Sequence, residues 1–453
     1  MCPCAFVGIN NMSSKNIIRV SEFEKLYYDD QKPFKQKHWE ALCRYLEGIN
    51  RKEKKRIEYF RILNKGIQFT NFVGVIQAGN LTIEILPKID RHATTAANET
   101  ISDVETDEPD TAKEKAKWQS ALLQMLKECR LLHVNQVDYA TLNLRSNSIL
   151  DIYLELFLAE AESLQHEGLL KKYRKQEGNQ TALKGQLQFS KQIAYNITHQ
   201  ERFYVRHTEY NRNNIYNQLL YKTIQLIPNI SNNALLLDKV GRIQMDFPEV
   251  AFVTVNEETF SRLSFDRKTE QYKDALLISK MLLLNYRPDI TGGTENVIAI
   301  LFDMNRLWEE WVYMRLKKEE SNFDITVHRQ QSVNFWQFSL LSKPKNIRPN
   351  IVIQRKSTKQ PIVIDTKWKI IDDMIPSDED LKQMYVYNLF WNCSSSILLY
   401  PSETKSSHVG DYVDFRDKNR LFTQCTVQTV SVFGEYGKLD MNFGNSLLET
   451  LLA

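Results

Sequence analysis

The residues with the clearest chemical potential lie between positions 348 and 369. The segment Arg348-Pro-Asn-Ile-Val-Ile-Gln is followed, seven residues later, by Ile362-Val-Ile-Asp-Thr-Lys-Trp-Lys. In two adjacent strands Asn350 would lie near Asp365, and Lys367 would share the face of Asp365 because alternate residues point the same way. Oxygen ligands hold Mg²⁺, which activates water and stabilises charge on a phosphate, and an ammonium group stabilises an anionic transition state. The spacing therefore indicates metal-dependent cleavage of a phosphodiester.

By itself, the Asp-x-Lys pattern is a weak signal. An acidic residue two positions before a lysine also occurs at Asp30, Glu53, Asp266, Asp380 and Glu403. A chance surface pair is the ordinary explanation at any single position. Context distinguishes Asp365, which ends a strand with the composition of a buried one, follows a second strand and has predicted helices on both sides.

The elements that must position these residues form an alternating series. Apolar periodicity predicts helices at 299–318 and 380–391. Short runs rich in β-branched residues predict strands at 325–327, 334–340, 351–354, 361–365, 396–400 and 427–433. Helices and strands in this order are typical of an α/β domain of ordinary size.

The chain before this domain divides into two regions. Residues 72–77 and 81–87 predict a hairpin around Ala78-Gly-Asn, in a β-rich N-terminal region. Residues 93–112 carry six acidic and no basic side chains, which indicates a disordered or surface loop that DNA phosphates would repel. Helices are then predicted at 150–175, 214–227 and 267–284.

A basic cluster closes the helix predicted at 150–175, where positive charge suits the helix dipole. It consists of Lys171, Lys172, Arg174 and Lys175. From 171 to 222 there are ten Lys or Arg residues against three Asp or Glu, with aromatic residues interleaved. Phosphate contact and base stacking would make this a DNA surface. The alternative is that the aromatic residues belong to a core and the charges only solvate its face.

Composition excludes several classes of protein. The chain has 453 residues, enough for two to four domains, and a net charge of only +3, so any DNA surface must be local. Six cysteines without CxxC spacing argue against a zinc ribbon and predict free thiols in a reducing cytoplasm. The sequence has no phosphate-loop motif, so nucleotide hydrolysis must come from a partner. No apolar run approaches the length of a membrane span.

These motifs together resemble a known family. Residues 348–367 resemble the core of PD-(D/E)xK nucleases, and the whole chain resembles the McrC family, the nuclease subunits of McrBC modification-dependent restriction systems. The resemblance extends over residues 65–400, with the motifs in the order of the family. Its further motifs are Ile85-Leu-Pro-Lys-Ile, Gly168-Leu with Tyr173, Leu183-Lys-Gly-Gln-Leu-Gln-Phe, Asn217-Gln-Leu-Leu-Tyr-Lys-Thr, Met304-Asn-Arg-Leu-Trp-Glu-Glu-Trp-Val and Asp380-Leu-Lys-Gln-Met-Tyr-Val-Tyr.

The resemblance implies an α+β multidomain fold and a role in a complex. It implies a β-rich region at 13–116 that engages the partner, a mainly helical, DNA-facing region at 117–295, and an endonuclease domain at 296–453. The implied partners are a hexameric McrB-type AAA+ GTPase, whose hydrolysis of GTP the chain would stimulate, and modified double-stranded DNA. GTP would act only through that partner.

The resemblance also assigns roles to individual residues. Asp365 is implied as a ligand of Mg²⁺ and Lys367 as the catalytic lysine. Glu309 matches an acidic residue on the preceding helix and becomes a further metal ligand. Gln383 matches a glutamine that supports the site from the following helix. For Glu309 and Gln383 the alternative is an exposed helical residue without a role.

Asn350 departs from the family pattern, which has Asp at this position. Asparagine offers one neutral oxygen to a metal, and the charge count of the site sets its affinity for Mg²⁺. Three explanations stay open: an engineered inactive variant, a naturally degenerate nuclease, or a shifted alignment of the motif. Besides a nuclease subunit, the chain is then compatible with a non-catalytic assembly factor that activates a GTPase, or with a stand-alone repair or resolvase nuclease.

Overall fold

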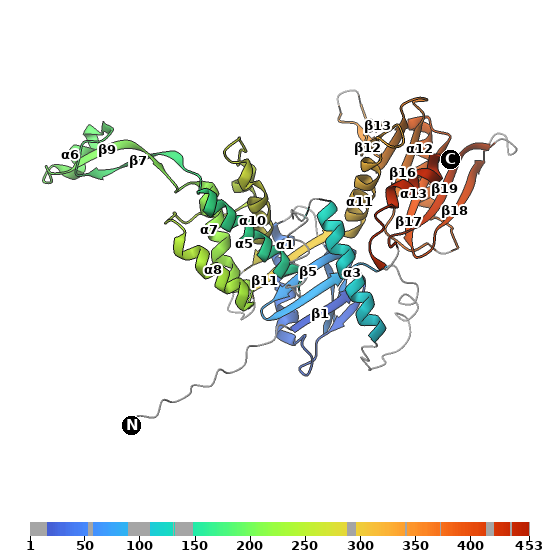
Figure 1. The fold of residues 1–453 in the computed structure, drawn as a ribbon, viewed down its shortest axis with the longest axis horizontal. Coiled ribbons are helices and arrows are strands. Elements are labelled where there is room, and N and C mark those ends of the chain that lie inside the picture. The colour runs from blue at the N-terminus through green and yellow to red at the C-terminus, as the bar shows by residue number, and fades with distance from the viewer. Residues whose placement is uncertain are drawn as a thin grey trace.

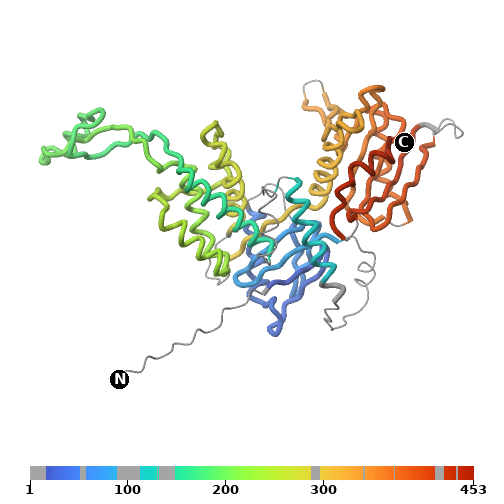
Figure 2. The backbone as a smooth tube through the Cα atoms, in the orientation of Figure 1, coloured from blue at the N-terminus to red at the C-terminus, as the bar shows by residue number. Residues whose placement is uncertain are grey.

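The computed structural model describes residues 16–52, 58–88, 109–129, 131, 148–287, 296–339, 342–371, 373–413, 421–434 and 437–452. Figure 1 shows a β-rich N-terminal part, a helical middle part that carries a long arm, and a C-terminal α/β part. The N-terminal part lies between the other two, and the arm and the C-terminal part extend to opposite sides (Figure 2). The expected α+β mixture of helices and sheets is confirmed.

A five-stranded sheet in the order β1-β6-β5-β11-β10 forms the N-terminal part. Its strands are β1 (Asn16–Ser21), β5 (Phe72–Ala78), β6 (Leu81–Leu86), β10 (Tyr286–Arg287) and β11 (Val297–Asp303). The expected hairpin is confirmed as β5 and β6, which pair antiparallel across a turn where Gly79 adopts a φ of 57°. Helix α1 (Gln36–Lys52) and a small sheet of β2 (Lys25–Tyr27), β4 (Gly66–Phe69) and β3 (Phe60–Leu63) complete this part.

Strand β11 corrects the helix predicted at 299–318. Residues 299–303 belong to the strand, which pairs with β5 so that Ile300 lies opposite Val75. The strand therefore joins the N-terminal sheet, although the C-terminal domain was expected to begin at 296. A short apolar run is compatible with a helix or with a strand. Residues 299–303 form a strand because they pair with β5. Asp303 then caps helix α11 (Met304–Lys318), its carboxylate accepting a hydrogen bond from the backbone of Asn305 at 3.0 Å.

Helices dominate the middle part. They are α5 (Ile149–Glu167), α7 (Ile215–Ile230), α8 (Ala234–Asp246), α9 (Glu257–Ser261), the 3₁₀ helix η1 (Glu270–Tyr272) and α10 (Lys273–Asn285). Helix α3 (Pro109–Glu128) packs instead on β6 of the N-terminal sheet and on α11. The helix expected at 214–227 is confirmed as α7, and the helix expected at 267–284 is confirmed from Lys273 onward as α10, preceded by a turn and by η1. The prediction of a helix up to residue 175 was wrong: α5 ends at Glu167, because Gly168 adopts a φ of 99°. The acidic stretch expected as a loop at 93–112 lies outside the described residues as far as 108, and α3 begins at Pro109.

The arm consists of β7 (Lys172–Gln180) and β9 (Phe203–Asn211), which pair antiparallel over their full length. Short strand β8 (Gln186–Leu187) and helix α6 (Phe189–Asn196) lie at its tip (Figure 1). Apolar side chains at this tip face water, with Phe189, Ile193 and Ile197 all well exposed.

The C-terminal part is a six-stranded sheet in the order β12-β15-β16-β17-β19-β18. Its strands are β12 (Ile325–Arg329), β15 (Ile351–Arg355), β16 (Pro361–Thr366), β17 (Ser395–Ser402), β18 (Ser406–Val413) and β19 (Leu421–Ser431). Helix α12 (Asp378–Trp391) connects the parallel strands β16 and β17, and α13 (Phe443–Leu452) ends the chain. The strand expected at 334–340 is shorter: β13 (Val333–Trp336) forms a separate hairpin with β14 (Lys345–Ile347).

A tryptophan cluster joins the N-terminal and C-terminal parts. The ring of Trp368, just after β16, lies 5.4 Å from Trp308 of α11 and 6.3 Å from Trp118 of α3. All three are buried in one continuous core, so the two parts share their apolar interior. In the described part of the chain, no helix has the length and apolar character to span a membrane. The cysteines described there, Cys43, Cys129, Cys393 and Cys425, form no disulfide.

Candidate functional site

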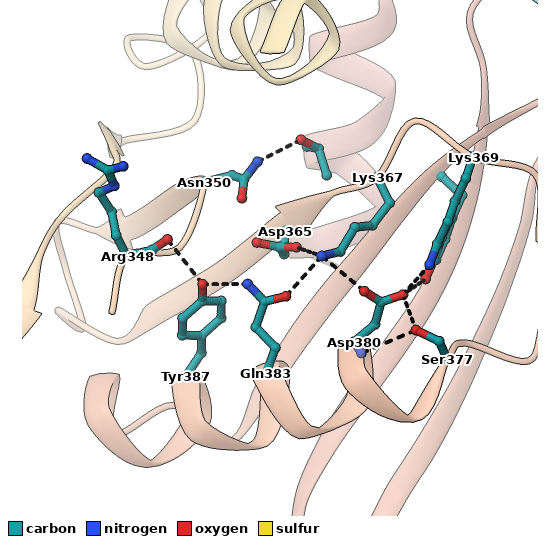
Figure 3. A network of polar contacts seen from close by, with 11 residues as sticks. Arg348, Asn350, Asp365, Lys367, Lys369, Ser377, Asp380, Gln383 and Tyr387 are labelled. Atoms are coloured by element: carbon teal, nitrogen blue, oxygen red, sulfur yellow. Dashed lines mark hydrogen bonds and ion pairs between the residues drawn. The ribbon is translucent and has the colours of Figure 1, made fainter. Parts of the chain in front are cut away.

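Strands β15 and β16 and helix α12 bring the predicted residues together (Figure 3). The two strands pair antiparallel with Ile351 opposite Ile364, so Asn350 comes opposite Asp365. This register brings the two positions next to each other, which the sequence motif predicts for two adjacent strands. Just past β16, the backbone N–H of Lys367 donates to the carbonyl of β17 residue Leu399 at 2.9 Å. The extended backbone thereby keeps Asp365 and Lys367 on one side.

The ammonium group of Lys367 is the centre of the constellation. Its Nζ lies 2.9 Å from Asp365 Oδ2, 3.0 Å from Asp380 Oδ1 and 2.9 Å from Gln383 Oε1. Burial disfavours the charged form of Lys367, but the two carboxylates outweigh it and raise the pKa. The lysine is therefore a cation held by three oxygen atoms.

Asp365 is the most deeply buried of the predicted residues, with 1% of its surface exposed. Burial raises the pKa of Asp365, and the carboxylates of Asp380 and Glu309 raise it further, against the opposing effect of Lys367. Its second oxygen, Oδ1, is buried and has no hydrogen-bond partner among the described residues. A buried carboxylate oxygen without a partner is costly, and a cation at this position would remove that cost.

Helix α12 contributes three side chains from one face. Asp380, Gln383 and Tyr387 are spaced at helical intervals and point toward the end of β16 (Figure 3). Gln383 donates through Nε2 to the Tyr387 hydroxyl at 2.7 Å, and that hydroxyl donates to the backbone carbonyl of Arg348 at 3.1 Å. Gln383 thus connects Lys367 to the strand end that carries Asn350.

Sequence reasoning missed Asp380. It was set aside as one of several chance Asp-x-Lys patterns, yet it contacts Lys367, and Lys369 Nζ at 2.6 Å. The Ser377 hydroxyl also donates to Asp380 at 2.8 Å. Burial alone would raise the pKa of Asp380, but hydrogen bonds from Lys369, Ser377 and Lys367 lower it to about 2. Its spacing of three residues from Gln383 was the available signal, because i and i+3 share a helix face.

Asn350 and Glu309 lie at the other edge of the constellation and are linked by Gln330. The amide of Asn350 donates to the Thr366 hydroxyl at 3.1 Å, and its backbone carbonyl accepts from the N–H of Gln330 at 3.0 Å. The side chain of Gln330 donates to Glu309 Oε1 at 2.7 Å. Glu309 is therefore held in place next to the site.

The donor set is poor in carboxylates for a metal. Among the described residues, no group of three or more His, Cys, Asp or Glu side chains is arranged to hold an ion. Asp380 is occupied by two lysines, which leaves Asp365 and Glu309 as charged donors and Asn350 as a neutral one. Oxygen donors suit Mg²⁺, and the buried oxygen of Asp365 without a partner fits such a cation.

The basic cluster expected to bind DNA lies far from this site. Lys172, Arg174 and Lys175 are on strand β7 at the base of the arm, and not at a helix end, while Lys171 directly precedes the strand. The ammonium group of Lys172 lies 4.2 Å from the centre of the Tyr216 ring. Lys171, Arg174 and Lys175 are exposed. Figure 1 shows this arm and helix α12 on opposite sides of the molecule.

Comparison with known proteins assigns the family. A family model described as "McrBC 5-methylcytosine restriction system component" matches residues 67–401. A structure of Thermococcus gammatolerans McrB AAA+ hexamers with bound McrC has 18% identity and a TM-score of 0.67, and the match covers 96% of this chain and 100% of that one. A second structure, the McrBC complex of the same organism, has 18% identity and a TM-score of 0.49, covering 67% and 88%. No curated protein matches. Because the family model spans well over half of the sequence, the chain belongs to the family of McrBC 5-methylcytosine restriction system components.

Proposed function

We propose that this chain is the DNA endonuclease subunit of a McrBC-type restriction complex and that its site is built around Lys367. The observation that carries the proposal is the position of this lysine, held by Asp365, Asp380 and Gln383 beside a buried carboxylate oxygen without a partner. Buried charges of this kind, with shifted pKa values, gather at functional sites.

The residues divide the work of phosphodiester hydrolysis. Asp365, Glu309 and Asn350 would hold Mg²⁺, which when bound supplies charge stabilisation at the phosphate and activation of water. Lys367 stays protonated because Asp365 and Asp380 offset its charge, and it stabilises the anionic transition state. Gln383 and Asp380 fix the position of its ammonium group.

Asn350 weakens this site. It replaces an expected carboxylate with a neutral oxygen, and the number of charged ligands determines the affinity for a divalent cation. We propose that the chain, with asparagine at position 350, cuts DNA slowly or not at all. The same residue favours a second candidate function, in which the chain is a non-catalytic activator of a GTPase with a degenerate nuclease fold.

In either case we propose an AAA+ GTPase hexamer as the partner, which would bind and hydrolyse GTP. The related structure holds McrB AAA+ hexamers with bound McrC. The N-terminal region 13–116 was expected to engage it. The exposed apolar residues on the tip of the arm support a second contact there, since such clusters are costly in water. Phe189, Ile193 and Ile197 are spaced four residues apart and face one way.

Modified double-stranded DNA remains the proposed substrate, with the cluster Lys171, Lys172, Arg174 and Lys175 as a DNA contact. Reversing these four charges should weaken DNA affinity and flatten its dependence on salt. An unchanged salt dependence would assign the cluster to solvent or to the GTPase interface.

Plasmid cleavage by the chain and by its Asn350→Asp variant tests the proposal. Each protein is assayed with Mg²⁺ and GTP, with and without the AAA+ partner, on methylated and unmethylated DNA. Cutting by the variant, and only with the GTPase present, is the expected result. A second variant, Asn350→Asp combined with Lys367→Met, should abolish that cutting while the stimulation of GTP hydrolysis is preserved.

Two other outcomes would change the assignment. No cutting by any form, with GTP hydrolysis still stimulated, would establish the activator and reject the nuclease. Structure-selective cutting without any GTPase would instead favour a stand-alone repair or resolvase nuclease.

A further inference from the structure

A pocket of about 810 Å³ opens beside the Lys367 network, between helix α12 and the hairpin of β13 and β14. Gln383 and Tyr387 line it on the side of the network, and Phe335 and Asn346 line it on the side of the hairpin. Because Gln383 accepts a hydrogen bond from Lys367, a molecule in this pocket would lie one side chain away from the catalytic ammonium group.

The hairpin presents aromatic rings to water. Phe335, Trp336 and Phe338 are 49%, 53% and 83% exposed. The ring of Phe335 lies 5.6 Å from Phe390 of α12, so the two elements form one apolar wall. Single exposed aromatic residues need no explanation, but a cluster next to a pocket marks a binding surface. An aromatic face stacks on any nucleobase.

Positive charge prevails in the same pocket. The exposed guanidinium of Arg348 forms no ion pair with any described residue, and Figure 3 shows it pointing away from the Lys367 network. Its backbone is fixed by the hydrogen bond from Tyr387. Lys382 has only a 4.0 Å contact with Asp378, and both side chains are largely exposed. Glu379 is the one carboxylate among the described lining residues, and a base N–H, such as the imino group of thymine, can donate to it.

We propose that this pocket holds one unstacked nucleotide of a DNA strand, adjacent to the phosphodiester presented to Lys367. The base stacks on Phe335, its edge reaches the amide of Asn346, and its phosphate meets Arg348. Pockets for small ligands have volumes of about 300–1,000 Å³, so the cavity accepts a nucleotide. Unstacking is easiest where the strands are separated or distorted, so the double-stranded substrate should be opened locally where it enters this pocket. This inference rests on the proposed nuclease function and names the substrate form.

Fluorescence anisotropy of the full chain tests the pocket without any cleavage. The probes are a fluorescein-labelled oligothymidylate and a duplex of equal length, both in EDTA. The variants are Phe335→Ser and Arg348→Gln, and the matched control is Phe252→Ser, which removes a ring that is 87% exposed and remote from the pocket lining. Thermal unfolding of each variant checks its fold, and Arg348→Gln, a surface change, carries the test if Phe335→Ser does not fold.

Phe335→Ser should raise the Kd for oligothymidylate about 5- to 150-fold, the range of one lost base stack. Arg348→Gln should lower the slope of log affinity against log salt by about 0.7, the value for one phosphate contact with a single strand. Phe252→Ser should change neither quantity.

Three results would overturn the pocket. If neither pocket variant changes the DNA affinity or its salt dependence, the nucleotide pocket is rejected and the nuclease proposal is unaffected. If the unsubstituted chain binds neither probe, both the nucleotide pocket and the proposed action on DNA are rejected. Unchanged DNA affinity with lost stimulation of the GTPase would assign the hairpin to a protein partner instead.

Discussion

Replacing Glu22 with glutamine should remove a pH-dependent loss of stability at the junction between the N-terminal and C-terminal parts. Glu22 follows β1, and its Oε1 accepts hydrogen bonds from the indole of Trp368 at 2.9 Å and the backbone of Lys88 at 3.3 Å. Its Oε2 is buried without a hydrogen-bond partner among the described residues. Burial raises the pKa of Glu22 to about 8, with a further upward contribution from Asp303 that the hydrogen bonds only partly oppose.

The sign of the effect follows from the two states of the chain. The pKa of Glu22 is about 8 when folded and 4.5, the ordinary value, when unfolded. Below pH 4.5 Glu22 is protonated in both states and does not lower the free energy of unfolding. As the pH rises toward 8 only the unfolded chain ionises, so each pH unit lowers the free energy of unfolding by about 1.4 kcal/mol. Above pH 8 the loss levels off at about 5 kcal/mol.

The assay is urea unfolding at pH 6 and pH 9, followed by tryptophan fluorescence. Glutamine keeps the oxygen that accepts from Trp368 and cannot ionise, so Glu22→Gln should lose about 2–3 kcal/mol less than the unsubstituted chain between the two pH values. Glu403→Gln, at an exposed position, removes the same charge and serves as the control. If Glu22→Gln and the unsubstituted chain lose equal stability, another group is responsible and the assignment to Glu22 is refuted.

Three further substitutions probe other contacts. Arg315→Met should destabilise the chain by about 3–5 kcal/mol in thermal unfolding, because it removes the ion pair at 2.6 Å from the largely buried carboxylate of Glu128 and leaves that carboxylate only its hydrogen bond from Trp311; a loss under 1 kcal/mol would contradict this. Gly185→Ala should loosen the arm by about 1–3 kcal/mol, since φ is +85° and a Cβ would meet the backbone of β9; limited proteolysis of the arm should accelerate. The pKa of Asp380, about 2, adds about 2 kcal/mol of stability above pH 4 that is lost as the pH falls through 2, and Lys369→Met should shrink that loss in acid unfolding.

The relative positions of Asn350, Asp365 and Lys367 could be predicted from the sequence. Alternation along a strand places Asp365 and Lys367 on one side, and the antiparallel register brings Asn350 opposite Asp365. These relations depend on residues within one hairpin. The contact between Lys367 and Gln383 depended on the resemblance to a family, because nothing local shows which face of α12 meets β16.

Contacts made by distant segments could not be read from local patterns. Residues 299–303 are equally suited to a helix, and they become a strand because β5, far earlier in the chain, offers an edge. The charges of residues 172–175 suit the C-terminal end of the helix predicted at 150–175. These residues instead form a strand, because they pair with β9. Asp380 gains its role only when α12 packs over β16, so its Asp-x-Lys pattern alone could not be separated from chance ones, and only its spacing from Gln383 pointed to the site.

The position of Trp368 connects the site to the rest of the molecule. It lies between Lys367 and Lys369, the two lysines that contact Asp380. Its ring packs on Trp308 and Trp118, and its indole is bonded to Glu22 on the N-terminal sheet. A shift of that sheet by a bound partner would be transmitted to the residue between the two lysines, and to Glu309 through α11, which continues directly from β11. At this tryptophan, a continuous set of packed and hydrogen-bonded side chains therefore connects the N-terminal sheet to the end of β16 that carries Lys367.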